Sequence, residues 1–469
     1  LVPRRHADIE HFVAKPFYQV IAHLETEQGE AFKARWQPSD ACQPWQDEEG
    51  RVLSKALAEN VVERIKGKPA VVNYCHKKAK KQPPPLPYNL SSLQIDAAKR
   101  FSMSAKQVLD ICQSLYEQHK LLTYPRSDSR YIPAQHYHQR STVLTAISDN
   151  AGFFSGSVLV QAVSDADQAL KSKAWNDSKV QAHHAIIPTA KTLCSASLNQ
   201  AEQQIYQLVA RQYVAQFYPD HQYCDSEISV TIAGGVFIAK ARESLLPGWK
   251  SLFETTHKTA QKLAKDTNKN VNKRSSQYFE KQELVLNTTL PALQKNQCCQ
   301  CLSGELVDKK TTAPKPFDDA SLLAAMTGIA RYVEDSSIRK ILKQTDGLGT
   351  EATRAGIIEL LFKRDFLTRK AKQIRATAAG KALINSLPAV STTPDMTAQW
   401  EVQLNAISRC ERSYQQFMAP LEQTLVQLIE QSQAVLPVGL KNAVNKKPAY
   451  KKSAAKKKSF KKTATSNRY

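Results

Sequence analysis

Hydrophobic and polar positions alternate in two separated parts of the chain, which predicts β structure on both sides of a helical segment. Residues 17–24 alternate like a half-buried strand. The same period of two returns at 223–246, where Gly234-Gly235 indicates a hairpin turn. We expect a further strand at 277–293. These positions predict one β domain interrupted by an inserted helical domain.

Between these parts the apolar period becomes helical. Proline cannot continue a helix or a ladder, so the proline-rich stretch 83–87 marks a boundary. Apolar residues then recur at helical spacing from 92 to 120, with Ser104 as the cap of the second of two short helices. They are Leu93, Ala97, Phe101, Val108, Ile111, Cys112 and Leu115. The helical domain should extend to about residue 221.

A third region, from residue 319 onward, is helical again. The stretch that starts at residue 347 resembles a helix, a turn, a β wing and a second helix. Residues 421–435 should close the folded part. The remainder, rich in lysine, alanine and serine, should be disordered. At about 150 residues per domain, 469 residues allow roughly three domains.

The charge of the chain indicates a polyanionic partner. The formal net charge is +22, and residues 441–469 contain eleven basic residues and no acidic one. Nucleic acid is favoured over an anionic membrane, because this tail has no apolar face that would lie on lipid. No apolar run approaches the roughly 18 residues that span a bilayer. We expect a soluble protein without a membrane partner.

The nine cysteines do not form a disulfide framework. Six are scattered singly, which is typical of a reducing cytoplasm. Cys298, Cys299 and Cys301 resemble half of a zinc site, but no second pair follows at suitable spacing. Ordinary thiols are therefore the favoured interpretation.

Three polar segments carry candidate chemistry. In the first, Tyr124-Pro125-Arg126 follows a predicted helix, and the proline favours an extended backbone. A tyrosine can attack phosphorus while an arginine two residues on holds the non-bridging oxygens. Taken alone, the tripeptide is more often a turn with a packed ring.

The second segment holds His183 and His184, which could bind a phosphate or protonate a leaving sugar oxygen. A histidine pair before a proline turn is the simpler alternative. In the third segment, Gly347 and Gly349 precede a helix that Thr350 or Thr353 can cap, so that backbone N–H groups could meet a phosphate. A capped structural helix is the alternative there.

Taken in order, these segments resemble the type IA DNA topoisomerases. Tyr124-Pro125-Arg126 is similar to the nucleophile motif of the family, and residues 183–189 to its histidine motif. Residues 347–359, 394–401 and 93–101 are similar to three further family blocks. The resemblance covers about residues 1–435. It is nearest to the topoisomerase III group, because residues 329–346 form a spacer that relatives of the topoisomerase I kind almost lack.

The resemblance implies an α+β multidomain toroid with a β-rich arch and helical domains of winged-helix character. It implies single-strand cleavage without ATP, strand passage and religation through a 5′-phosphotyrosyl intermediate, with relaxation of negative supercoils and decatenation. Tyr124 would be the nucleophile, Arg126 would hold the scissile phosphate, and His183 would assist. DNA, single-stranded or negatively supercoiled, would be the partner in a bacterial cytoplasm, near the nucleoid.

Further DNA contacts are expected from polar residues of the matching blocks and of the spacer. The expected residues are Gln94, Arg100, Arg130, Thr350, Thr353, Arg354, Arg331, Arg339, Lys340 and Lys343. For the spacer, a solvated basic helix face is an equally good interpretation.

Family members begin with a Toprim domain whose carboxylates bind Mg²⁺, and we expect this chain to be a fragment that lacks it. No metal ligand is therefore expected here. Asp165-Ala166-Asp167 has the family's spacing but lies in the helical domain. The expected domains are 1–12 (a remnant of the domain after Toprim), 13–90 and 222–317 (the arch), 91–221 (the tyrosine domain), 318–435 and the tail 436–469.

Two other classes of function compete with this interpretation. A non-catalytic module that binds single-stranded DNA would keep the tyrosine side of the site without its metal half. A tyrosine recombinase fits poorly, because those enzymes need an Arg-His-Arg-Tyr set with the tyrosine near the C-terminus.

Overall fold

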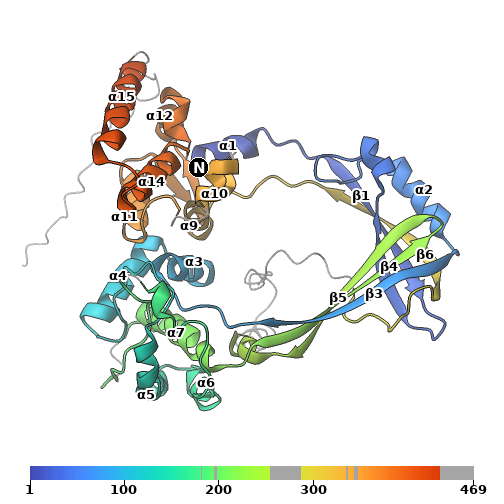
Figure 1. The fold of residues 1–469 in the computed structure, drawn as a ribbon, viewed down its shortest axis with the longest axis horizontal. Coiled ribbons are helices and arrows are strands. Elements are labelled where there is room, and N and C mark those ends of the chain that lie inside the picture. Colours follow the sequence, from blue (N-terminus) through green and yellow to red (C-terminus); the bar gives the residue numbers. More distant parts are fainter. Residues whose placement is uncertain are drawn as a thin grey trace, which may run out of the picture.

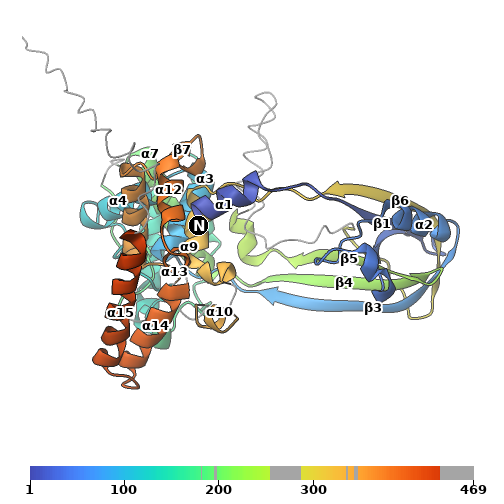
Figure 2. The same ribbon diagram turned by 90° about the horizontal axis from the view of Figure 1, so that it is seen from above.

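In the computed structural model, the chain forms a ring in which a β-barrel lies opposite two groups of helices (Figure 1). The structure describes residues 1–180, 182–194, 198–253, 287–333, 336–342, 347–393 and 395–433. Seen from above, the barrel is the far end of a long arm that extends from the helices (Figure 2). The expected α+β class is confirmed.

The barrel consists of six antiparallel strands that close in the order β1-β2-β5-β4-β3-β6. Their bounds are β1 Pro16–Glu25, β2 Ala31–Gln37, β3 Pro69–Gln82, β4 His221–Ile232, β5 Gly235–Leu246 and β6 Cys298–Lys310. Helix α2 (Lys55–Ile65) contributes Ala58, Val61 and Ile65 to the barrel core. Gly304 of β6 permits this approach, since a Cβ there would lie 3.1 Å from the Val62 backbone.

The alternating pattern predicted the early strand and the central hairpin, but it did not predict the position of the last strand of the barrel. The strand at 17–24 and the hairpin at Gly234 are confirmed by β1 and by β4–β5. The strand expected at 277–293 falls largely outside the described residues. Within 287–293 only an isolated bridge at Asn287 occurs, and the strand begins at Cys298 instead. In β6, Cys299 and Cys301 alternate into the barrel core.

The inserted helical region extends from α3 to α7. It contains α3 (Leu90–Phe101), α4 (Ala105–Glu117), α5 (Arg140–Gly152), α6 (Leu159–Ser164) and α7 (Gln200–Val214), with short 3-10 turns between them. Ser104 caps α4 as predicted, and its hydroxyl accepts the Gln107 N–H at 3.2 Å. Strands β3 and β4 connect this region to the barrel (Figure 1).

The third region follows β6. It contains α9 (Asp319–Thr327), η6 (Ile329–Tyr332), α10 (Ser336–Leu342), α11 (Glu351–Lys363), β7 (Leu367–Lys370), β8 (Gln373–Ala376), α12 (Ala378–Ser386), α13 (Ala389–Thr392), α14 (Asp395–Ser408) and α15 (Tyr414–Gln433). The succession α11, β7, β8 and α12 confirms the predicted helix, wing and helix. The lysine-rich tail lies outside the described residues.

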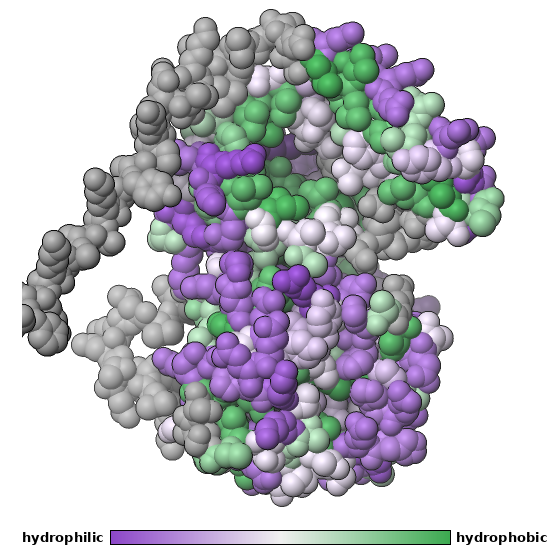
Figure 3. All heavy atoms as spheres, turned by 90° about the vertical axis from the view of Figure 1, so that its left-hand side faces the viewer, coloured by the Kyte–Doolittle hydropathy of each residue, from purple (hydrophilic) through white to green (hydrophobic). Residues whose placement is uncertain are grey.

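The two helical regions share one hydrophobic core. Leu93 of α3, Leu115 of α4, Leu323 of α9 and Ile358 of α11 belong to the same buried cluster. N-terminal helix α1 (Val2–Glu10) packs on β8 and α12. On the outer face of the helices, hydrophilic side chains gather over the lower half (Figure 3). The two regions therefore pack as one body on the side of the ring opposite the barrel.

Candidate active site

Helix α4 fixes the start of the segment that carries Tyr124. Val108, Leu109, Cys112 and Leu115 lie on its buried face, which joins the core. Burial raises the pKa of the Cys112 thiol to about 12. After the helix the chain reverses, and the Leu121 N–H donates to the Leu115 carbonyl at 2.8 Å. The nucleophile candidate therefore follows a rigid element.

The segment around Ile187 holds the Tyr124 loop by backbone contacts. The Thr123 N–H donates to the Ile187 carbonyl at 3.0 Å, and the Ile187 N–H donates to the Thr123 hydroxyl at 3.0 Å. That hydroxyl also donates to the Ala185 carbonyl at 3.2 Å. Leu122 and Pro188 form an isolated β-bridge. These bonds place the histidine motif beside the tyrosine motif.

Tyr124 lies between two other rings. Its side chain is 38% exposed. The Tyr124 and His183 ring centroids are 4.6 Å apart, and the Tyr116 ring meets Tyr124 edge-on at 5.8 Å. Pro125 is buried, whereas Arg126 is exposed. The structure thus brings Tyr124 and His183 together, with Arg126 on the same exposed loop.

The second histidine has a different environment. A ring nitrogen of His184 lies 2.8 Å from the Ala185 carbonyl, and its ring lies 4.9 Å from the His136 ring. Burial and the neighbouring His184 lower the pKa of His136. Only His183 faces Tyr124, so the two adjacent histidines diverge as side chains on an extended backbone do.

The third segment turns sharply before α11. Gly347 has φ +87°, and a Cβ there would lie 2.5 Å from the Met326 carbonyl oxygen, so only glycine fits. Thr350 is the N-cap of α11, and its backbone N–H donates to the Thr353 hydroxyl at 3.2 Å. Both threonines are exposed or partly exposed beside this turn. The predicted cap is confirmed.

Side chains of α11 join the start of α3 through a buried network. Arg354 donates to Glu351 at 2.7 Å and to the Ser91 hydroxyl at 2.8 Å. The Glu351 carboxylate also accepts the Ser91 N–H at 2.6 Å. The Arg354 side chain is 0% exposed. The network links the two helical regions across the core.

Burial corrects the prediction of DNA contact for two residues. Gln94 is 0% exposed and donates to the Ala105 carbonyl at 2.9 Å, between α3 and α4. Arg354 is enclosed in the network described above. Neither side chain reaches the surface, so both are structural residues in this conformation.

Two other residues predicted to contact DNA donate hydrogen bonds within the protein. The Arg100 Nε donates to buried Asp96 at 2.8 Å. Arg130 donates to the Leu86 and Pro87 carbonyls at 2.7 and 3.0 Å, which fixes the proline-rich boundary. Arg100 is exposed and Arg130 is partly exposed, and their role toward DNA stays a prediction.

The spacer forms short helical turns with exposed basic side chains. Arg331 donates to the Gly328 and Ala324 carbonyls, and Arg339 donates to the Val333 carbonyl. Lys340 is exposed, and Lys343 lies outside the described residues. The role of these basic side chains toward DNA stays a prediction.

No group of three or more histidine, cysteine or acidic side chains that could hold a metal ion occurs among the described residues. Cys298 is exposed, while Cys299 and Cys301 face the barrel core, so the three thiols diverge. Asp167 follows α6 and accepts the Ala169 N–H at 2.9 Å, as an ordinary turn residue.

The motifs gave no signal for Tyr116 or for Lys120. Tyr116 lies in the last turn of α4, and a turn of the chain separates it from Tyr124. The contact between the two rings therefore depends on the fold. Lys120 adopts φ +57° and places its ammonium 5.8 Å from the Tyr116 ring centroid. A positive φ at a lysine cannot be inferred from a sequence.

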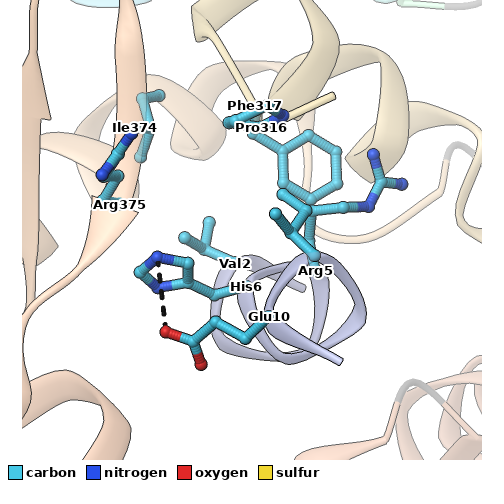
Figure 4. A pocket seen from close by; sticks show the side chains of 9 residues that line it. Val2, Arg5, His6, Glu10, Pro316, Phe317, Ile374 and Arg375 are labelled. Atoms are coloured by element: carbon cyan, nitrogen blue, oxygen red, sulfur yellow. Dashed lines mark ion pairs between the residues drawn. The ribbon is translucent and has the colours of Figure 1, made fainter. Parts of the chain in front are cut away.

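A separate pocket of about 280 Å³ lies between α1, the segment before α9 and the wing. His6, Arg5 and Phe317 line it, and the Arg5 guanidinium lies 4.4 Å from the Phe317 ring centroid (Figure 4). The His6 Nδ1 has no hydrogen-bond partner there, while its Nε2 lies 4.0 Å from Glu10. None of the lining residues belongs to the Tyr124 site.

The site and the fold together define the class of protein. A family model described as DNA topoisomerase matches residues 1–419, and the chain belongs to this family. It is 49% identical over 459 residues to DNA topoisomerase 3 of Vibrio cholerae and 50% identical over 444 residues to that of Pasteurella multocida. These matches cover 97% and 92% of this chain.

The same matches cover only 66% and 64% of the two relatives, so the chain spans somewhat less than two thirds of their length. A solved structure, full-length topoisomerase I from Thermotoga maritima, matches with a TM-score of 0.58 and 15% identity. That match covers 92% of this chain and 62% of the other, and it supports the fold. The expected resemblance to type IA topoisomerases of the topoisomerase III kind is confirmed.

Proposed function

We propose that the protein cleaves and rejoins single DNA strands through a tyrosine ester, as a type IA topoisomerase of the topoisomerase III kind. One observation carries this proposal. The half-exposed Tyr124 ring contacts the His183 ring, on a loop that also presents exposed Arg126. Two rings suited to phosphoryl transfer thus meet on a rigid support, and an exposed arginine lies two residues away on the same loop.

In the proposed reaction the Tyr124 oxygen attacks a backbone phosphorus. A bond forms between phosphorus and the tyrosine oxygen, and the bond to the 3′ oxygen breaks. The Tyr124 hydroxyl gives up its proton as it attacks, the 3′ oxygen takes up a proton as it leaves, and the tyrosine holds the 5′ end. Passage of another strand and the reverse attack restore the backbone. One phosphate ester replaces another, so ATP is not required.

The neighbouring groups have distinct roles in this scheme. Arg126 would hold two non-bridging oxygens through its planar fork. His183 would donate a hydrogen bond to the phosphate or to the leaving oxygen. Its ring contact also orients the Tyr124 ring, which brings the nucleophilic oxygen toward the strand.

The resemblance implies Mg²⁺ as a cofactor, held by carboxylates of a Toprim domain. The described residues offer no such cluster and do not fit the ion, so we derive no step through it. We propose domains at 1–12, 13–90, 91–221, 222–317, 318–435 and 436–469.

DNA is the proposed partner, in single-stranded or negatively supercoiled form. The net charge of +22 supports a polyanion. Among the described residues, no helix is both long and apolar enough to cross a bilayer. We propose a place in the bacterial cytoplasm, near the nucleoid, and a role in relaxing and decatenating DNA.

The test is to trap the ester and find which DNA end it holds. The chain, alone and with a Toprim domain from a relative supplied in trans, is mixed with Mg²⁺ and single strands labelled at either the 5′ or the 3′ end. Denaturant then stops the reaction. Protein-bound label from 3′-labelled strands alone supports the proposal. Bound label from 5′-labelled strands alone contradicts it. Binding without any adduct would favour the single-strand binding module.

A further inference from the structure

Lys120 occupies a backbone conformation that lysine rarely adopts. Its φ of +57° is in the left-handed region, where glycine is favoured. The backbone on either side of this turn is hydrogen-bonded, because the Lys120 carbonyl accepts the Thr189 hydroxyl at 2.6 Å and the Leu121 N–H donates to the Leu115 carbonyl at 2.8 Å. Glycine could make the same backbone bonds without strain. The backbone geometry therefore does not explain a lysine at this position.

Lys120 and Tyr124 both lie near the ring of Tyr116. The Lys120 ammonium is 5.8 Å from the Tyr116 ring centroid, and the Tyr116 ring meets the Tyr124 ring edge-on. Within the described part of the chain, Lys120 has no carboxylate partner, whereas Lys106 of the preceding helix α4 pairs with Asp110. Lys120 is exposed, and its ammonium lies near the ring that contacts the proposed nucleophile.

We propose that Lys120 binds a backbone phosphate of the strand on which Tyr124 acts, and that Tyr116 positions both side chains. This inference rests on the function proposed above. The ammonium approaches Tyr116 rather than Tyr124, so its phosphate is a neighbour of the cleaved one. A lysine suits such a contact, because a flexible point charge neutralises a phosphate without needing a fixed fork.

The experiment measures the affinity of the full chain for single-stranded oligo(dT) across a series of salt concentrations. Lys120→Met and Lys120→Gly should each flatten the slope of log affinity against log salt by about 0.7, the value for one phosphate on a single strand. At about 0.15 M salt the affinity should fall roughly fourfold. Lys120→Arg should keep the slope of the original chain.

Two comparisons separate charge from structure. Glycine relieves the backbone, so Lys120→Gly should unfold at higher denaturant than Lys120→Met. Equal slopes in these two variants, despite unequal stability, assign the effect to the lost charge. Lys106→Met is the matched control and should leave the slope unchanged, because that ammonium is already paired with Asp110.

Unchanged slopes in both Lys120→Met and Lys120→Gly overturn the inference, as does an equal loss in Lys106→Met. The proposed function is tested separately by the trapped ester. If the ester depends on Tyr124 while the Lys120 variants keep the original slope, only the role of Lys120 is wrong. If the chain forms no ester and binds no strand, the proposed function fails and this inference with it.

Discussion

Replacing Arg354 by methionine should destabilise the contact between the two helical regions. The side chain is 0% exposed and donates to Glu351, to the Ser91 hydroxyl, and to the Leu348 and Gly349 carbonyls at 2.7–3.1 Å. Methionine fills similar space but donates nothing. It would leave the Glu351 carboxylate buried without its cation.

The magnitude follows from the loss of one partner of a buried ion pair. Such a loss costs about 3–5 kcal/mol, because the remaining charge stays desolvated. Glu351 is 9% exposed and keeps the Ser91 N–H, so we expect the lower half of that range, about 3–4 kcal/mol. Removing both charges in Arg354→Met with Glu351→Gln should cost clearly less than the two single losses added together.

The assay is urea unfolding followed by circular dichroism. Arg364→Met is the control, since this exposed arginine follows the same helix, and it should change the free energy of unfolding by less than about 0.5 kcal/mol. A loss below about 1 kcal/mol in Arg354→Met would refute the buried network, because a solvated arginine alone gives so small an effect. The folded variant should keep the salt slope for DNA, since Arg354 cannot reach a phosphate.

Three further outcomes follow from the same structure. Arg126→Ala should slow ester formation by about one to two orders of magnitude, because a charge-assisted contact contributes about 1.5–3 kcal/mol. Arg126→Lys should restore only part of the rate. An unchanged rate of ester formation in quenched time courses would contradict this role. Cys112, whose pKa is raised to about 12 by burial, should resist alkylation at pH 8 in the native chain, while exposed Cys194, Cys298 and Cys410 react, as mass spectrometry of digests would reveal. Deleting residues 441–469, with their eleven basic residues, should flatten the salt dependence of DNA binding without changing sequence preference, and an unchanged slope would exclude the tail from the contact.

The sequence predicted elements whose signals are local. The alternation before and after Gly234 predicts β4 and β5, and Ser104 predicts the start of α4, because periodicity and capping involve residues near one another in the chain. Strand β6 was missed, because its cysteines and charges do not alternate clearly. Its position depends on pairing with β1 and β3, which are distant in sequence.

In the candidate site, too, local motifs were predicted from the sequence, whereas the burial of side chains depends on tertiary packing. Tyr124, Arg126 and His183 were selected by their chemistry and motif spacing, and the fold brings Tyr124 and His183 into contact. The polar residues Gln94 and Arg354 looked equally suited to DNA, but tertiary packing buries both. Residue type alone did not show that these two side chains join buried networks, because the choice of DNA contacts followed polarity and not the apolar face of each helix.

The most direct test of the account is the Tyr124→Phe variant in the ester-trapping experiment. The ring contacts to Tyr116 and His183 remain in this variant, and no described residue bonds the lost hydroxyl. Stability should therefore change by less than about 0.5 kcal/mol, and single-strand binding should persist. We expect the protein–DNA adduct to disappear completely while binding is kept. An adduct formed by the phenylalanine variant would mean that another residue is the nucleophile.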